Sequence, residues 1–166
     1  MRSDESFFLS LQSFMAQHTV NIKNKKAYFD YFVEETFEAG LVLQGTEIKS
    51  IRKGKASIAE AHCVFHGKEL FVRNMNISEY AFGTYNNHEP KRERKLLLKA
   101  RELKKMEKKT KESGYTIIPL RLYISESGYA KMEIGLSRGK RKYDKRDTLK
   151  EKDNRREMER KDTYKY

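Results

Sequence analysis

Two runs in the last third of the chain decide the fold: Tyr115-Thr116-Ile117-Ile118-Pro119-Leu120-Arg121-Leu122-Tyr123-Ile124 and Tyr129-Ala130-Lys131-Met132-Glu133-Ile134-Gly135-Leu136-Ser137. Along each run one face collects the even positions, which are Thr116, Ile118, Leu120, Leu122 and Ile124, then Ala130, Met132, Ile134 and Leu136. A period of two is typical of strands with one buried face. Because Ser125-Glu126-Ser127-Gly128 can turn the chain, an antiparallel hairpin is predicted. Pro119 cannot donate an N–H, so we expect an edge or an unpaired position there.

The residues before this hairpin indicate further strands. Residues 28–43 are rich in aromatic and β-branched side chains but are too many for one flat strand, so a bent or bulged strand, or two strands, is predicted. Residues 45–53 change to helical spacing and end at Gly54, which predicts a short helix. Residues 61–65 and 69–77 flank His66-Gly67-Lys68 and are typical of a second hairpin.

A loop and a helix are expected between the two hairpins. Residues 78–89 carry turn formers, and Pro90 is expected in the first turn of the longest helix. Its apolar stripe would hold Leu96, Ala100, Leu103 and either Met106 or Glu107, and it would end at Gly114. This order of elements favours a mainly β fold of the α+β type, in which a small antiparallel sheet curls into a barrel with flanking helices.

The positive charge of the chain is concentrated in two segments. The net charge is +12, and residues 91–112 hold 11 Lys/Arg against 4 Asp/Glu, while residues 138–166 hold 13 against 7. The remainder is close to neutral. Such segments are typical of phosphate binding, although they also suit plain solvated surfaces.

The C-terminal segment cannot pack a core of its own, because Leu149 and Met158 are its only aliphatic side chains. It is therefore predicted to be disordered when free. After Gly139 it contains neither Gly nor Pro and is rich in helix formers, so binding to a polyanion should make it helical. We expect three regions: a loose N-terminal extension at 1–20, a barrel domain at 21–137 and a basic tail at 138–166.

Composition also limits the compartment and the chemistry. Cys63 is the only cysteine and no run reaches the length of a membrane span, so we expect a cytoplasmic protein with no membrane partner. His62, Cys63 and His66 lie too far apart on a strand to chelate a metal ion unaided, so no metal site is expected. No phosphate-binding loop or serine nucleophile motif is present, and no enzyme or cofactor is expected.

Three groups of residues remain as candidates for binding nucleic acid. Asn24-Lys25-Lys26 precede the first long strand, and Lys91-Arg92-Glu93-Arg94-Lys95 would crowd the first turn of the expected helix, where a phosphate could offset their repulsion. Glu38, beside Ala39-Gly40, could accept hydrogen bonds from guanine or cytosine amino groups, or could be an ordinary solvated side chain. The 10 tyrosines and 9 phenylalanines include candidates for base stacking.

The chain also resembles one bacterial family over residues 21–161. The motifs are Asn24-Lys25-Lys26-Ala27, Tyr31-Phe32-Val33-Glu34-Glu35-Thr36-Phe37-Glu38-Ala39-Gly40, Leu43-Gln44-Gly45-Thr46-Glu47-Ile48-Lys49-Ser50-Ile51-Arg52-Lys53-Gly54-Lys55-Ala56, Arg92-Glu93-Arg94-Lys95-Leu96-Leu97-Leu98 and Lys131-Met132-Glu133-Ile134-Gly135-Leu136-Ser137-Arg138-Gly139-Lys140-Arg141-Lys142-Tyr143-Asp144-Lys145-Arg146. In order and spacing they are similar to the tmRNA-binding small protein B (SmpB) family. Arg141 stands where lysine is common, which keeps the charge.

The resemblance implies an OB-like (oligonucleotide-binding-type) β-barrel that binds the tRNA-like domain of tmRNA and delivers it to stalled ribosomes. It implies a tail that enters the empty mRNA channel and becomes helical. The RNA-binding residues of the body would be Asn24, Lys25, Lys26, Glu38, Ala39, Gly40, Arg92, Arg94, Lys95 and Leu97. The ribosome-contacting residues of the tail would be Gly139, Lys140, Arg141, Tyr143, Asp144, Lys145 and Arg146.

The expected partners are tmRNA and the ribosome, through ribosomal RNA at the decoding centre and the mRNA channel. A monomer, with one copy per tmRNA, is expected. The main alternative is a general single-stranded RNA or DNA chaperone built on the same barrel. An RNA-processing enzyme using Glu34, Glu35 or Glu38 with a metal, and a structural ribosomal protein, are further alternatives.

Overall fold

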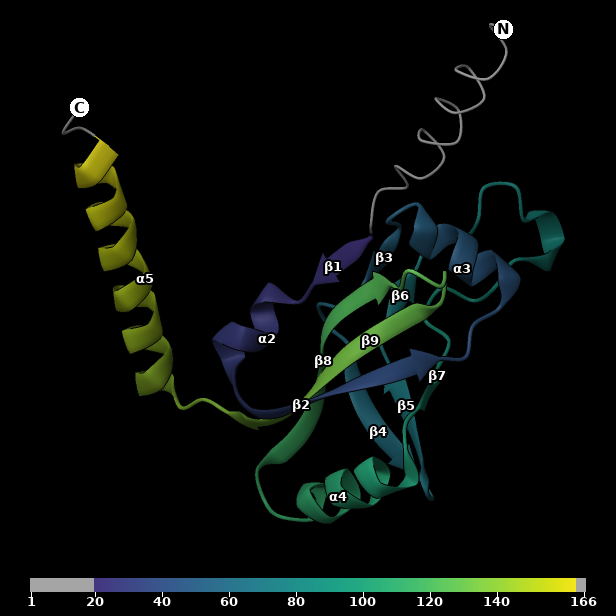
Figure 1. Cartoon of the computed structure of the whole chain (residues 1–166), viewed down its shortest axis with the longest axis horizontal. Helices are drawn as coiled ribbons and strands as arrows, with labels where there is room; N and C mark the ends of the chain where they lie inside the picture. Colours follow the sequence, from purple (N-terminus) through teal and green to yellow (C-terminus); the bar gives the residue numbers. More distant parts are fainter. Residues whose placement is uncertain (1–19, 164–166) are drawn as a thin grey trace, which may run out of the picture.

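Six strands close into an antiparallel ring in the structure, a computed structural model that describes residues 20–163 (Figure 1). The strands are β2 (Tyr31–Leu41), β4 (His62–His66), β5 (Glu69–Arg73), β7 (Arg94–Leu97), β8 (Tyr115–Ile124) and β9 (Ala130–Gly139). They follow the order β8-β4-β5-β7-β2-β9, and β9 pairs back with β8. The predicted mainly β barrel with flanking helices is thereby confirmed.

Short elements complete the fold around this barrel. β1 (Asn21–Lys23) pairs with β8, and β3 (Ala56–Ser57) pairs with β6 (Asn76–Ile77) in a separate two-stranded sheet. The predicted short helix is α3 (Gly45–Arg52), and the predicted second hairpin is β4–β5, turning at Gly67 with a φ of +62°. Residues 78–89 form the expected loop, which contains one 3-10 turn, η1 (Thr84–Asn86).

The β8–β9 hairpin is present, but its alternation holds on only one strand. In β9 the predicted face of Ala130, Met132, Ile134 and Leu136 is buried. In β8 the register shifts between Pro119 and Arg121, so Ile117 and Leu122 face the main core while Ile118 and Leu120 pack against Ala27. The prediction of one continuous face was therefore wrong for β8. Pro119 lies between the stretches of β8 that pair with β4 and with β1, where its missing N–H leaves no partner unpaired.

The segment predicted as a bent or bulged strand, or as two strands, begins within a helix. Residues 25–30 form α2 (Lys25–Asp30), and the strand itself is β2, with a bulge between Val33 and Glu35. Asn24 caps α2, because its Oδ1 accepts a hydrogen bond from the N–H of Ala27 (3.1 Å). The predicted bulge is confirmed, whereas the assignment of residues 28–30 to a strand was wrong.

The prediction of a helix starting at Pro90 was also wrong. Residues 94–97 form β7, which pairs with β5 and β2, and the helix α4 (Ala100–Thr110) begins only after it. Lys91 to Lys95 therefore do not form the first turn of a helix, and the phosphate site expected there has no basis. Met106 of α4 is fully buried and packs into the main core.

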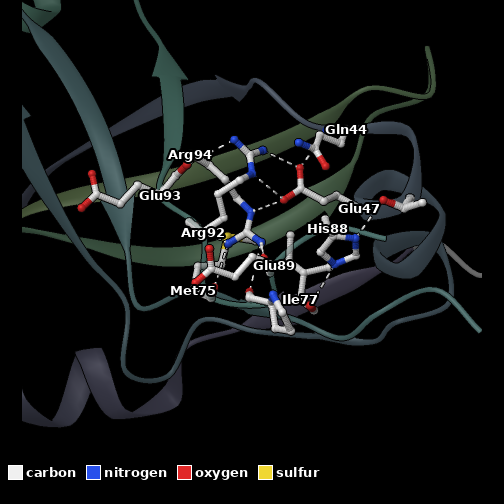
Figure 2. Close-up of polar contacts among 11 residues, drawn as sticks. Gln44, Glu47, Met75, Ile77, His88, Glu89, Arg92, Glu93 and Arg94 are labelled. Atoms are coloured by element: carbon white, nitrogen blue, oxygen red, sulfur yellow. Dashed lines mark hydrogen bonds and ion pairs between the residues drawn. The ribbon is translucent and has the colours of Figure 1, made fainter. Parts of the chain in front are cut away.

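A buried ion network fixes β7 against α3 (Figure 2). Glu47 and Arg94 are both fully buried, with Arg94 Nε 2.8 Å from Glu47 Oε1. Arg92 Nη2 donates to Glu47 Oε2 (2.6 Å), and the backbone N–H of Gln44 donates to the same oxygen (2.7 Å). The remaining donors of Arg94 reach the carbonyls of Met75 (2.8 Å), Arg92 (2.7 Å), Pro90 (3.0 Å) and Glu89 (3.4 Å). Burial alone would raise the pKa of Glu47, but these hydrogen bonds and the charge of Arg94 outweigh it and lower that pKa.

The C-terminal segment is a helix, α5 (Lys142–Thr163), that projects away from the barrel (Figure 1). Its start is held by Asp30, whose backbone oxygen accepts from the Lys140 N–H (2.9 Å) and whose carboxylate pairs with Lys145 (2.8 Å). Residues 149–160 are all exposed. β9 continues to Gly139, which pairs with Tyr31, so the sheet extends past the expected boundary at residue 137. Disorder of the free tail stays a prediction, and the expected extension at 1–20 lies, except for Val20, outside the described residues.

We expect Glu47→Ala to lower the free energy of unfolding by about 3–5 kcal/mol, because it leaves the buried Arg94 guanidinium without its counter-charge. Urea denaturation followed by circular dichroism measures the loss. Glu60→Ala is the matched control: Glu60 pairs with Lys26 at 2.7 Å in solvent, so stability should barely change. Similar losses in both variants would contradict a special role for Glu47.

The same network predicts the direction of the pH dependence. Since the folded-state pKa of Glu47 is lowered, its stabilising effect is fully present above the unfolded-state value of about 4.3. That effect is lost as the pH falls through the lower folded-state pKa. The stability difference between the wild type and Glu47→Ala should therefore be constant at neutral pH and shrink below about pH 4.

Candidate nucleic-acid interface

A row of four residues crosses four strands on the outer face of the barrel. Gly40 of β2 lies opposite Leu97 of β7 on one side and Lys131 of β9 on the other, and Lys131 lies opposite Tyr123 of β8. Leu97 is 51% exposed, so its apolar side chain is available at this face. Gly40 places no side chain between Lys131 and Leu97, so the backbone of β2 can be approached closely there.

Glu38 lies beside this row and is held by two of its neighbours. Its Oε1 accepts a hydrogen bond from Lys131 Nζ (2.6 Å), and its Oε2 accepts one from the Tyr123 hydroxyl. The hydrogen bond from Lys131 and then that from Tyr123 lower the pKa of Glu38, so it is an anion at neutral pH. With its side chain 54% exposed, this carboxylate is positioned in advance and still able to accept a further donor.

A second cation stands next to the row. The Arg121 guanidinium lies 4.3 Å from the centre of the Tyr123 ring, and its Nε is 3.8 Å from Glu133 Oε2. We name Glu38, Gly40, Leu97, Arg121, Tyr123 and Lys131 together the Glu38 surface. An anion among cations, with an exposed leucine and a stacked arginine, can accept from base amino groups, contact phosphates and pack against sugars or bases.

Sequence reasoning missed three members of this surface, Arg121, Tyr123 and Lys131. Lys131 had a usable signal, since it alternates with the buried Met132 in a predicted strand and must therefore face outward. The same signal existed for Arg121 and Tyr123, since they alternate with the buried Leu122 in a predicted strand and must also face outward.

Three of the expected RNA contacts are buried, and their direct contact with RNA stays a prediction. Ala39 points into the core, and Arg94 is taken up by Glu47. Asn24 is buried as well, because its amide Nδ2 donates to the carbonyls of Ile58 (3.1 Å) and Pro119 (3.0 Å). The polar side-chain atoms of Asn24 and Arg94 are hydrogen-bonded within the chain.

The other expected residues of the body are at the surface but do not form one cluster. Lys25 is exposed on α2, and Lys26 pairs with Glu60. Arg92 is partly buried against Glu47, and Lys95 pairs with Glu69. Glu38, Gly40 and Leu97 are thus the expected residues that the structure brings together.

The expected tail residues lie at the opposite end of β2. Gly139 is the last residue of β9, and Lys140 Nζ donates to the carbonyl of Tyr28 (3.1 Å) and lies 4.8 Å from the centre of the Phe32 ring. The N–H of Arg141 donates to Asp144 Oδ2 (3.1 Å), and Arg146 is exposed. The side chain of Tyr143 lies outside the described residues. Glu38 and Gly40 are close to the other end of the strand, so the two groups form separate surfaces.

The chain matches the family model described as SmpB protein over residues 21–164. The chain belongs to the SmpB family. Curated relatives named SsrA-binding protein are similar to it: that of Cytophaga hutchinsonii is 59% identical over 85% of this chain and 92% of its own length, and that of Phocaeicola vulgatus is 57% identical over 85% and 94%. A more distant relative from Bacillus cytotoxicus is 54% identical over 83% of this chain and 88% of its own.

A solved structure supports the membership of the SmpB family. It is described as "tmRNA-SmpB: a journey to the center of the bacterial ribosome", and one of its chains is 41% identical to this one. The TM-score is 0.64, over 78% of this chain and 94% of that one. Within residues 20–163, no helix is long and apolar enough to cross a membrane, and no group of three His, Cys, Asp or Glu is placed to hold a metal ion.

The contact between Glu38 and Tyr123 yields a measurable prediction. The hydrogen bond to Glu38 raises the pKa of Tyr123, so Glu38→Gln should bring that pKa back toward its ordinary value of about 10. A pH titration by NMR with labelled tyrosine rings would measure it. Glu34→Gln is the control, because Glu34 contacts Tyr115 rather than Tyr123 and should leave the transition unchanged. An unchanged Tyr123 in Glu38→Gln would contradict the contact.

Proposed function

We propose that this SmpB-family protein is an RNA-binding adaptor of trans-translation that binds the tRNA-like domain of tmRNA and delivers it to stalled ribosomes. The family match over residues 21–164 carries the proposal. Relatives are named SsrA-binding proteins, and the similar solved structure is described as tmRNA-SmpB in the bacterial ribosome. We further propose that it acts in the cytoplasm as a monomer, with one copy per tmRNA and without catalysis.

The Glu38 surface is the proposed contact with tmRNA. Glu38 would accept from an amino group of an exposed base, while Lys131 and Arg121 contact phosphates. Leu97 and Gly40 would let a base or sugar approach the sheet closely. The hydrogen bonds from Lys131 and Tyr123 support this role, because a carboxylate already held in place loses little rotamer entropy on binding.

The tail, residues 140–166, is proposed as a separate ribosome-binding unit that enters the empty mRNA channel. Its support is the exposure of every residue from 149 to 160. Without packing, a helix of this composition is marginal in water, and neutralisation by ribosomal RNA would stabilise it. A channel filled by mRNA would exclude the tail by volume.

Glu38→Ala should weaken binding to a transcript of the tRNA-like domain of tmRNA by about tenfold, since one side-chain contact to a base is worth roughly 1–3 kcal/mol. Filter binding or fluorescence anisotropy would measure it. Glu34→Ala is a closely matched control, because Glu34 is also on β2, accepts from the Tyr115 hydroxyl (3.0 Å) and pairs with Arg138 (3.3 Å). Equal effects would remove the specific role of Glu38. Stronger binding to unstructured RNA than to this transcript would favour the chaperone alternative.

A chain that stops after Arg141 should bind the same transcript nearly as well as the full chain but should not support peptide tagging. The cut leaves β9 intact, including the pair between Gly139 and Tyr31. Tagging is measured in a reconstituted translation system programmed with an mRNA that lacks a stop codon. A collapse of RNA affinity on truncation would refute the separation into two binding units.

A further inference from the structure

The loop at residues 78–89 is held in shape by its own hydrogen bonds. Asn87 closes it, because its Oδ1 accepts from the Tyr80 N–H (3.0 Å) and its Nδ2 donates to the Tyr80 carbonyl (2.7 Å). The N–H of Gly83 donates to the same carbonyl (2.8 Å). A Cβ on Gly83 would lie 2.6 Å from Asn87 Nδ2, so only glycine fits beside this amide. The loop is therefore braced without contributing to the core.

This braced loop holds two aromatic rings in solvent. Phe82 is 76% exposed and Tyr85 is 93% exposed. Between them Thr84 has a φ of +44°, which is strained for a β-branched residue. Single exposed apolar side chains are ordinary, but two rings on a strained, closed loop indicate a surface that meets a partner.

Lysines of α3 give this surface a positive charge. Lys49 Nζ lies 5.3 Å from the centre of the Tyr80 ring, and Lys53 Nζ lies 4.8 Å from that ring and 5.2 Å from Phe82. Arg52 and Lys55 are close by in the chain, and Glu79 is the acidic residue that precedes Tyr80. Exposed rings next to cations are the combination that stacks unpaired bases and neutralises their phosphates.

The loop lies at the same end of the barrel as the Glu38 surface. Arg52 Nη2 of α3 donates to the carbonyl of Gly128 (3.2 Å) in the β8–β9 turn, which is flanked by Tyr123 near the end of β8 and Lys131 near the start of β9. α5 projects from the opposite side of the molecule (Figure 1). An RNA lying on the Glu38 surface can therefore continue over the turn and α3 to the loop.

We propose that Phe82 and Tyr85, with Lys49 and Lys53, form a second binding surface that stacks unpaired bases of the same folded RNA that the Glu38 surface binds. This inference rests on the proposed function and extends it by a contact at the far edge of α3. Tyr80, already covered by the two lysines, supports the surface, and the two exposed rings make the contact.

The test compares a double variant that lacks both aromatic rings with one that keeps them. Phe82→Ala/Tyr85→Ala should weaken binding to the transcript of the tRNA-like domain by about fivefold or more, the effect expected for one lost base stack. Phe82→Tyr/Tyr85→Phe keeps both rings and should bind within about twofold of the wild type. Leu149→Ala, at an exposed aliphatic side chain of α5, is the control for general surface change. Thermal unfolding shows whether each variant is folded.

Crosslinking can detect the contact directly, even where the affinity for RNA does not change. Photoreactive benzoylphenylalanine in place of Tyr85 should crosslink to unpaired nucleotides of the transcript, and crosslinks only to paired stems, or none, would overturn the inference. Normal RNA binding by the ring-less double variant, with weak binding by Glu38→Ala, overturns it while leaving the proposed function intact. If Glu38→Ala also binds normally, the proposed function itself fails. If the double variant loses binding only to ribosomal subunits, the loop contacts ribosomal RNA or protein instead. That result would overturn the proposed binding of the loop to the folded RNA.

Discussion

The buried carboxylate of Glu47 is the constraint on which the rest of the surface depends. A fully buried anion requires charged partners, and the chain supplies Arg92 and Arg94, about 45 residues further along. Their side chains must turn inward, so residues 94–97 become a strand and Leu97 is placed beside Gly40. Without the ion pair, burying the charged residues at the start of this segment in the barrel would be energetically unfavourable.

The β8–β9 hairpin sets the positions of the remaining residues of the Glu38 surface. Because of the bulge at Pro119, β8 contributes side chains to two hydrophobic clusters. Ile117 and Leu122 pack in the barrel interior. Ile118 and Leu120 pack in a smaller cluster under α2. Gly135 allows that crossing, since a Cβ there would lie 2.9 Å from both Leu120 and Val33. The outward residues Arg121, Tyr123 and Lys131 then lie beside Glu38 at a fixed register.

The sequence predicted those parts of the fold whose signal comes from residues close together in the chain. Alternation in β9, the helix ending at Gly54 and the turn at Gly67 depend on neighbours in sequence, and all were confirmed. The stripe Leu96, Ala100, Leu103 and Met106 has helical spacing throughout, yet its first member belongs to a strand, because the partner of Arg94 is distant in sequence. Glu38 could be placed outward and Ala39 inward from alternation alone. The inward position of Asn24 depends on carbonyls of Ile58 and Pro119, which only the folded chain brings to it.

Because α5 is attached to the barrel at Asp30, a small change of angle at this residue displaces the far end of the helix. One backbone hydrogen bond and one ion pair to Asp30 act as a pivot near the start of this 22-residue helix, in which residues 149–160 are all exposed. At 1.5 Å per residue the arm is about 33 Å long, so a tilt of about 10° at the pivot would sweep its tip through about 6 Å. A small adjustment where the arm meets the barrel is thereby converted into a displacement as large as the spacing between neighbouring nucleotides.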